Sequence, residues 1–250
     1  MINGHTENIF VQELPAITVQ RLTKSFGDRP VLRDLDLKLH LGEILVLFGA
    51  NGSGKTTLIR SLGTLAKIDK GVIRIMGRDL RRRGAFLRRF IGVLTHQTFL
   101  YDELTGQENL RFYGQMFGLR NVNERIRILT EKMGLHGILD KRVGTLSHGM
   151  QKRLSIVRAV LHDPAILLLD EPESGLDEEA LSLLSHLLSG EDKGKRAVII
   201  TTHNLGYGFG LADHVGILAN GHIAYQQDRG SLDMMAFRDV YTGYLSKALK

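Results

Sequence analysis

A glycine-rich loop between a buried strand and a helix carries the clearest chemistry in this sequence. The apolar run Ile44–Phe48 leads into GANGSGKTT at residues 49–57, and a helix is predicted to begin at Lys55. Glycines let consecutive backbone N–H groups converge on phosphate oxygens, while a helix N-terminus and a lysine add positive charge. The pattern predicts a triphosphate-binding loop, with the Thr56 hydroxyl on a magnesium ion. Its expected binding residues are Gly49, Asn51, Gly52, Ser53, Gly54, Lys55, Thr56 and Thr57.

Two adjacent carboxylates follow a second buried strand. The run Ile166–Leu169 ends in Asp170 and Glu171. We expect this strand to lie adjacent to the glycine-rich loop, so that both carboxylates face the terminal phosphates. Asp170 would then hold magnesium through water, and Glu171 would orient and polarise the attacking water. A strand ending in polar residues is common by itself, but together with the loop it predicts hydrolysis of a nucleoside triphosphate.

Single polar residues follow two further predicted strands. Gln97 comes after Ile91–Leu94 and is expected to contact both the magnesium site and a moving helical region. His203 comes after Ala197–Thr201, where its imidazole can hydrogen-bond a terminal phosphate oxygen. Taken singly, each is more often an ordinary surface or turn residue. Their order along the chain is what indicates a site.

The segment LSHGMQ at residues 146–151 predicts a second anion-binding surface. Ser147 is the expected N-cap of a helix, and a bare cap is the simplest interpretation. A serine hydroxyl, the Gly149 N–H and a helix N-terminus together also suit a phosphate. Because one triphosphate rarely needs two such surfaces from one chain, we expect Ser147 and Gly149 to complete the nucleotide site of a second copy.

The elements that position these residues alternate between strands and helices. Strands are predicted at residues 17–21, 31–39, 44–48, 72–76, 91–94, 166–169, 197–201, 215–218 and 223–225. Helices are predicted at residues 55–65, 107–117, 123–133, 150–161 and 231–250. This alternation predicts an α/β fold with a mixed, mostly parallel sheet that binds its ligand at the carboxyl ends of the strands.

The domain organisation follows from one such loop and no internal repeat. Residues 1–250 are expected to form a single nucleotide-binding domain. Within it we expect a core at residues 17–96 and 166–226, an inserted helical subdomain at 97–165 and a C-terminal helix at 227–250.

Composition narrows the class of protein. The 250 residues are 43% hydrophobic, enough to bury a full core, and include no cysteine, which removes disulfides, thiolate metal sites and cysteine nucleophiles. No run approaches the ~18 apolar residues of a membrane span, and the first twenty residues lack the basic-then-apolar order of a signal peptide. The sequence therefore predicts a cytosolic protein unless a partner tethers it to a membrane.

The basic charge is concentrated in one segment. Residues 74–89 hold seven arginines against Asp79, a local charge of +6 that equals the formal charge of the whole chain. A cluster of this kind is most often a solvated helix face. The alternatives are binding to acidic lipid head groups, to the cytoplasmic loops of a membrane partner, or to nucleic acid.

The order of these motifs resembles the ATP-binding cassette (ABC) family of transporter ATPases over roughly residues 17–226. GANGSGKTT matches the family's Walker A motif, Gln97 its Q-loop, LSHGM its signature, ILLLDEP its Walker B motif, residues 174–177 its D-loop and His203 its switch histidine. The resemblance implies a P-loop NTPase core with an antiparallel β subdomain and an inserted α-helical subdomain. It also implies ATP and Mg²⁺ as cofactors.

The resemblance assigns roles to particular residues. Lys55 and Thr56 would bind phosphate and magnesium, with Gln97 and Asp170 also at the metal. Glu171 would be the catalytic base, assisted by His203. Ser147 and Gly149 would meet the γ-phosphate held by a second copy of the chain, and Asp177 would lie across the dimer seam.

Two departures from the family pattern stand out. The usual signature is Leu-Ser-Gly-Gly-Gln, and here His148 and Met150 replace its third and fifth residues, leaving the serine and the second glycine in place. The aromatic residue expected to stack on adenine is usually tyrosine, whereas the nearest candidate here is Phe26. Stacking needs only the ring face, so we expect base contact to be kept.

The region after Gln97 implies the partners, since in this family it docks on the transmembrane permease subunits. The phrases HQTFLYDELT, ENLRFYG and LSHGMQKRLSIVRA resemble exporter ATPases, and most of all the ATPase subunits of haem export in cytochrome c maturation. ATPases of exporters of drugs, lipids or polysaccharide have similar sequences in these segments. The expected protein is a peripheral ATPase on the cytoplasmic face of the cell membrane.

Other classes fit the sequence less well. Cassette ATPases that act on DNA carry long heptad coiled coils and those that act on ribosomes carry two cassettes, and this chain has neither, so nucleic acid is not the expected partner. A GTPase would carry an Asn-Lys-x-Asp motif, which is absent. A regulator without turnover would lack the catalytic carboxylate, whereas Glu171 is present.

Overall fold

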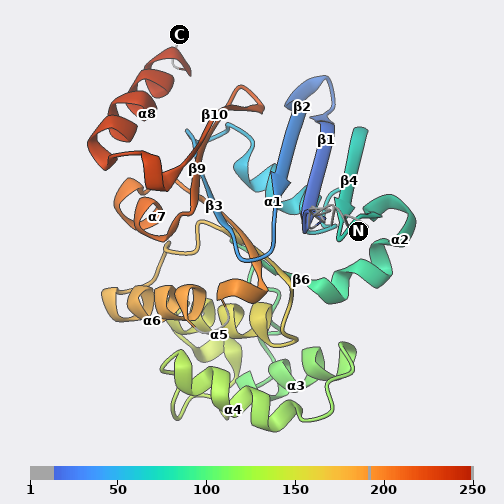
Figure 1. Ribbon diagram of the computed structural model, residues 1–250. Helices are drawn as coiled ribbons and strands as arrows, with labels where there is room; N and C mark the ends of the chain where they lie inside the picture. Colours follow the sequence, from blue (N-terminus) through green and yellow to red (C-terminus); the bar gives the residue numbers. More distant parts are fainter. Residues whose placement is uncertain (1–13, 191–192, 249–250) are drawn as a thin grey trace, which may run out of the picture.

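The computed structural model describes residues 14–190 and 193–248, in which strands and helices alternate around two sheets (Figure 1). The strands are β1 (Ile17–Phe26), β2 (Arg29–Leu39), β3 (Ile44–Phe48), β4 (Lys70–Ile75), β5 (Arg78–Asp79), β6 (Ile91–Leu94), β7 (Ile166–Asp170), β8 (Ala197–Thr202), β9 (His214–Ala219) and β10 (His222–Asp228). The helices are α1 (Lys55–Leu62), α2 (Leu80–Leu87), α3 (Gly106–Met116), α4 (Val122–Lys132), α5 (His148–Val160), α6 (Glu178–Ser189), α7 (Leu205–Leu211) and α8 (Met234–Ala248).

The central sheet has the strand order β10-β9-β3-β8-β7-β6. Its pairings are parallel except for β10, which runs antiparallel to β9. Strands β3, β7 and β8 are apolar runs buried at every position, as expected for interior strands of a parallel sheet. The predicted mixed, mostly parallel sheet is confirmed.

The two motif-bearing strands, β3 and β7, are not neighbours in the sheet. Strand β8 lies between β3 and β7, and it pairs in parallel with β3 from Ile44↔Val198 to Phe48↔Thr202 and with β7 from Ile166↔Ala197 to Asp170↔Thr201. Strand β7 pairs with β8 along one edge and with β6 along the other, so neither edge is left for β3. The three carboxyl ends still meet at one edge of the sheet, because all three strands run the same way.

A second sheet is antiparallel, with the order β2-β1-β4-β5, and lies at the upper right of Figure 1. Strand β1 extends five residues beyond the predicted end at Arg21, because it forms a hairpin with β2 that pairs Phe26 with Arg29. The turn passes through Gly27, whose φ of 58° suits a residue without a Cβ. Hairpin pairing therefore carries a polar stretch into a strand.

Helices α3, α4 and α5 lie between β6 and β7 in the chain and form the lower part of the molecule in Figure 1. Helix α3 begins at a capping box, in which Thr105 and Glu108 satisfy each other's backbone N–H groups. Helix α5 begins after its predicted cap, Ser147, whose side chain accepts a hydrogen bond from Met150 N. The caps explain why these helix starts were predictable.

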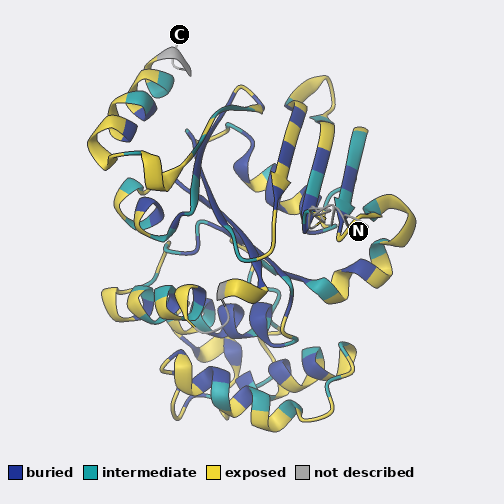
Figure 2. Cartoon of the chain, in the orientation of Figure 1, coloured by how far each residue is buried: buried dark blue, intermediate teal, exposed yellow. Residues whose placement is uncertain are grey.

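Two hydrophobic clusters cover the two faces of the central sheet (Figure 2). Alternate residues of β3 divide between them: Val46 and Phe48 face the cluster that includes α5 and α8, while Leu45 and Leu47 face the one with α1 and the antiparallel sheet. The site-bearing loops therefore leave a sheet that is packed on both sides.

The C-terminal helix starts later than predicted. Strand β10 continues to Asp228 and a 3-10 turn follows at Arg229–Ser231. Helix α8 begins at Met234, where the Asp233 carboxylate accepts hydrogen bonds from Met235 N and Ala236 N. The predicted helix end at residues 249–250 and the first thirteen residues, where no signal peptide is predicted, lie outside the described residues. Within the described ranges, no helix has the length and apolar character to cross a membrane.

Candidate active site

The glycine-rich loop joins the buried end of β3 to α1. Gly52 and Gly54 have φ values of 80° and 110°, which residues that carry a Cβ rarely adopt. A Cβ at Gly49 would lie only 2.5 Å from the Leu218 carbonyl oxygen. The loop conformation therefore requires glycine at these three positions, and the Ser53 hydroxyl is buried within it without a hydrogen-bond partner.

Lys55 is the first residue of α1 and is almost completely buried. Its Nζ donates to the carbonyl oxygens of Gly49 at 2.8 Å and Ala50 at 3.1 Å, and lies 3.8 Å from Glu171 Oε1. Burial lowers the pKa of Lys55, while nearby carboxylates, led by Glu171, act to raise it. The loop lysine and the predicted catalytic carboxylate are thus brought together from β3 and β7.

Asp170 and Glu171 differ sharply in environment. Asp170 is fully buried at the end of β7, and its Oδ1 accepts a hydrogen bond of 2.6 Å from the Thr201 hydroxyl. Glu171 leaves the strand with a φ of 45°, and its backbone N–H donates to Thr201 O at 2.8 Å. A left-handed conformation at a non-glycine residue is rare and is found most often at functional sites. The turn directs the Glu171 side chain away from the strand axis and toward Lys55.

Two histidines flank the carboxylates. His203 Nδ1 lies 3.4 Å from Glu171 Oε1, and His96 Nε2 lies 3.9 Å from both Glu171 Oε2 and Asp170 Oδ2. The predicted pairing of His203 with the phosphate end of the site is consistent with this position after β8. His96 was not singled out in the sequence, although its place directly before Gln97 at the end of β6 is a signal that could have found it.

Two more polar residues, Lys152 and Glu173, lie beside the carboxylates and were not predicted as site residues. The buried Lys152 Nζ donates to Glu171 O at 3.3 Å. The Thr202 hydroxyl donates to Glu173 Oε1, and burial raises the pKa of Glu173. No short motif marks either residue, because each reaches the site through the packing of α5 and the Walker B turn.

The donor set at this edge fits a magnesium ion. Asp170 Oδ2 is buried and has no hydrogen-bond partner among the described residues, so an acceptor oxygen remains available. Carboxylate, hydroxyl and amide oxygens are the ligands that Mg²⁺ prefers. Thr56, Gln97 and Asp170 are the residues that would hold it. Gln97 is exposed and only its backbone is engaged, since Gln97 N and O both bond the Thr95 hydroxyl.

The signature and D-loop segments are tied to each other. Ser147 is exposed at the N-terminus of α5, and a Cβ at Gly149 would lie 3.4 Å from Gly175 O. Asp177 caps α6 by accepting a hydrogen bond from Ala180 N at 2.9 Å. Arg153 Nη2, on α5, donates to both Asp177 carboxylate oxygens at 2.7 and 2.8 Å. This ion pair fixes the start of α6 against the signature helix.

The structure does not bring every predicted site residue together. Within the part of the chain that the structure describes, no hydrogen bond or ion pair joins Ser147, Gly149 or Asp177 to the loop at residues 49–57. Phe26 is also separate: it is 57% exposed at the end of β1, with Lys24 Nζ 5.1 Å from its ring centroid. Lys55, Glu171 and His203 lie together, whereas Ser147, Asp177 and Phe26 are exposed apart from them and Gly149 is half-buried.

The fold and the site together define a P-loop ATPase with an inserted helical region. Residues 32–174 match the family described as "ABC transporter". The chain is also 32% identical over 226 residues to the ABC transporter ATP-binding protein NatA of Bacillus subtilis, covering 88% of this chain and 91% of the relative. The chain belongs to the ABC transporter family and is an ABC ATPase.

Other relatives carry more specific names. The chain is 36% identical over 208 residues to the Nod factor export ATP-binding protein I of a Rhizobium strain, covering 82% of this chain and 68% of the relative. It is 34% identical over 210 residues to the daunorubicin resistance ATP-binding protein DrrA3 of Streptomyces coeruleorubidus, covering 83% and 66%. None of these three relatives is named for haem export.

Solved structures confirm the ABC ATPase fold. An ATP-binding subunit of an ABC transporter superposes with a TM-score of 0.81 at 28% identity, covering 94% of this chain and 98% of that one. The cassette MJ0796, solved as a dimer in a post-hydrolysis state with ADP and Pi, superposes with a TM-score of 0.76 at 25% identity, covering 85% and 98%.

Proposed function

We propose that this chain is the ATP-hydrolysing subunit of an ABC exporter and that it closes as a dimer around ATP. The observation that carries the hydrolytic part is the convergence of Lys55, Glu171 and His203 at one edge of the sheet, with contacts of 3.8 and 3.4 Å to the Glu171 carboxylate. These groups come from the ends of three neighbouring strands, so the fold itself assembles them.

The chemistry follows from these positions. The N–H groups of residues 49–57 and the Lys55 ammonium bind the phosphates and stabilise the charge that develops during transfer. Glu171 accepts a hydrogen bond from the attacking water and orients it. His203, beside the same carboxylate, donates to a terminal phosphate oxygen. Phe26 offers one exposed ring face to the adenine.

Magnesium completes the site. Thr56, Gln97 and Asp170 would hold a Mg²⁺ ion, which would supply positive charge against the phosphates. The Thr201 hydroxyl holds Asp170 Oδ1, which leaves Oδ2 directed to the site. Thr201 is therefore a positioning residue for the metal carboxylate.

The dimer explains the residues left outside the hydrolytic centre. Among the described residues, no hydrogen bond or ion pair joins Ser147, Gly149 or Asp177 to their own phosphate-binding loop, and Ser147 is exposed at a helix N-terminus. We assign them to the nucleotide held by a second copy. The dimeric structural relative with ADP and Pi supports this assignment.

Transmembrane permease subunits are the proposed partners of the helical region at residues 97–165. Family membership supports a peripheral position at the cytoplasmic face of a membrane. Because Gln97 joins β6 to this region, closing of the dimer would move the region together with the magnesium site.

For the cargo we favour a drug, lipid or polysaccharide over haem. Relatives named for Nod factor export and daunorubicin resistance support an exporter of such cargo. The prediction of haem export depends only on the sequences of three short segments. Nucleic acid is not a proposed partner.

Everted membrane vesicles containing the chain and its permease test the proposal. We expect ATP-dependent accumulation of a drug, lipid or polysaccharide, lost in the Glu171→Gln variant. Accumulation of haem alone would restore the haem assignment. ATP turnover without accumulation of any of these cargoes would contradict the exporter function.

A further inference from the structure

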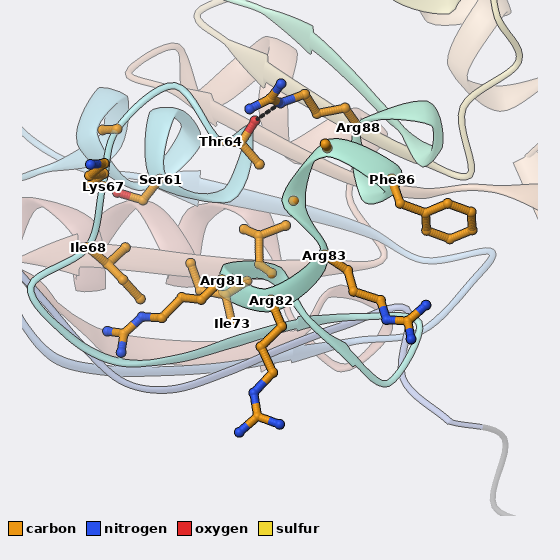
Figure 3. Close-up of a pocket in the computed structure, with 14 residues that line it drawn as sticks. Ser61, Thr64, Lys67, Ile68, Ile73, Arg81, Arg82, Arg83, Phe86 and Arg88 are labelled. Atoms are coloured by element: carbon orange, nitrogen blue, oxygen red, sulfur yellow. Dashed lines mark hydrogen bonds between the residues drawn. The ribbon is translucent and has the colours of Figure 1, made fainter.

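A basic surface surrounds helix α2 and the cavity beside it (Figure 3). The cavity encloses about 960 Å³ between the C-terminal end of α1, β4 and α2. Apolar side chains such as Ile68, Ile73 and Leu80 line it together with cationic ones. We call the exposed arginines here the arginine face, which consists of Arg78, Arg81, Arg82, Arg83, Arg88 and Arg89.

No carboxylate neutralises the arginine face. Among the described residues, none of its six guanidinium groups takes part in an ion pair. Asp79, the one acidic residue of the segment, accepts a hydrogen bond from Arg81 N and serves as the cap of α2. By contrast, Arg127 on α4 is paired with Glu124 and Glu131. Within the described part of the chain, the arginine face therefore keeps an unneutralised positive charge that an anionic partner would complement.

The position of the arginines within α2 also favours binding of an anion. Arg81, Arg82 and Arg83 occupy the first turn, which contains no acidic residue, so they meet the positive end of the helix dipole. The arrangement is unfavourable for the chain alone. An anion bound over this turn would reduce the repulsion among the three guanidinium groups and their repulsion from the helix dipole.

The guanidinium groups do not converge on one point. The helix bends at Arg83, whose φ and ψ are −132° and 24°. In Figure 3, the side chains of Arg81, Arg82 and Arg83 spread in different directions from the start of α2. One small anion cannot contact all three groups, whereas a layer of separate phosphates can.

Exposed apolar side chains adjoin the arginines. Leu14, Met76 and Phe86 are 76%, 37% and 36% exposed. The guanidinium groups of Arg78 and Arg89 lie 5.3 and 4.6 Å from the centroid of the Phe86 ring. Arginines beside exposed large apolar groups are typical of surfaces that lie at a membrane interface.

We propose that the arginine face binds anionic phospholipid headgroups, with Phe86 and Met76 at the level of the glycerol backbones. The inference rests on the proposed function, because a permease subunit would hold the chain beside a membrane. Spread charges and exposed apolar groups favour a lipid layer over an acidic protein segment, which would present its carboxylates along one line. The surface would orient the ATPase on the membrane.

Sedimentation of the full chain with vesicles tests the proposal. We expect binding to phosphatidylcholine vesicles containing about one third phosphatidylglycerol, little binding to pure phosphatidylcholine, and weaker binding at high salt. Joint substitution Arg82→Glu and Arg83→Glu should lower binding at least about tenfold. Arg82→Lys with Arg83→Lys should retain it.

A matched pair controls for net charge. Arg120→Glu with Lys132→Glu changes the charge by the same amount outside the arginine face and should leave vesicle binding unchanged. Equal binding to neutral and anionic vesicles, or equal losses in the two pairs, would overturn the proposal. The proposal would also be overturned if the wild-type chain bound an acidic permease segment but no vesicles, and the Arg82→Glu, Arg83→Glu variant no longer bound that segment. ATP turnover of the same variants in solution should be unchanged, which separates this outcome from failure of the ATPase assignment.

Discussion

Glu171 joins most of the site's contacts at the scale of single residues. Its carboxylate lies near Lys55, His96 and His203, while its backbone is held by Thr201 and Lys152. A side chain fixed in this way is positioned before substrate arrives, which is the condition for efficient electrostatic catalysis.

Replacement of Glu171 by glutamine should slow ATP turnover at least about tenfold while ATP affinity stays near that of the wild type. The amide keeps the shape of the side chain but cannot accept a proton. Steady-state phosphate release and a nucleotide titration measure the two quantities. Glu131→Gln, on the surface of α4, is the matched control, and unchanged turnover in Glu171→Gln would remove the catalytic role.

Lys55→Ala should weaken ATP binding at least about tenfold, because it removes the buried cation of the phosphate-binding loop. Fluorescence titration with a labelled nucleotide measures the affinity. Lys132→Ala should bind as the wild type does. Equal affinity in Lys55→Ala would count against the loop as the phosphate site.

The residues of the short motifs could be predicted from the sequence, because the residue types that each role requires lie within a few positions of one another. The supporting residues could not. His96 and Lys152 reach the carboxylates through the pairing of β6 with β7 and the packing of α5, and Glu173 through the turn after β7. Apart from the place of His96 beside Gln97, no short pattern marks these contacts.

At the scale of elements, α5 and β6 make a close contact that ties the helical region to the sheet. Arg158, on α5, donates to Val93 O at 2.7 Å, and His162 Nε2 lies 3.2 Å from Ile91 O. Since a carbonyl oxygen only accepts, His162 Nε2 carries the proton. The His162 ring also stacks on Phe117, with centroids 3.8 Å apart.

This contact should make stability depend on pH. Burial lowers the pKa of His162 to about 4, so the unfolded chain binds more protons between that value and the ordinary pKa. The free energy of unfolding should therefore fall by about 1 to 2 kcal/mol as pH drops from about 7 to about 5. His162→Gln keeps a donor for Ile91 O but does not titrate. Urea unfolding should show a smaller pH dependence in this variant, and an identical dependence would contradict the assignment.

The same contact should not tolerate a side chain at Gly92. A Cβ there would lie 2.2 Å from Ala159 O and 2.8 Å from Pro164 Cγ. Gly92→Ala should therefore lower the free energy of unfolding by about 2 kcal/mol or more. Gly84→Ala is the control, because no heavy atom lies within 4 Å of its added Cβ. Similar urea midpoints for the two variants would show that β6 and α5 can separate without cost.

Element positions were predictable where caps and apolar runs mark them, as for α5 and β3. The strand order was not. Placing β8 between β3 and β7 depends on long-range pairing, and the late start of α8 depends on the Asp233 cap.

At the scale of the whole molecule, we propose that one chain supplies two parts of a nucleotide site, and no hydrogen bond or ion pair joins these parts within the described residues. The phosphate-binding loop and its carboxylates form one part, and Ser147 with Gly149 forms the other. The exporter class could be expected from the motifs, whereas the cargo could not, because the cargo of a transporter is selected by subunits other than its ATPase.

ATP-dependent dimerisation of the Glu171→Gln variant tests the central claim most directly. Light scattering coupled to gel filtration should give the mass of one 27.9 kDa chain without nucleotide and of two chains with ATP. Adding Ser147→Arg should leave the chain monomeric in ATP, because the arginine would block the surface that meets the partner's nucleotide, while a charge change at Lys132 should have no effect. A Glu171→Gln protein that stays monomeric at saturating ATP, or a dimer that is indifferent to Ser147→Arg, would contradict the account.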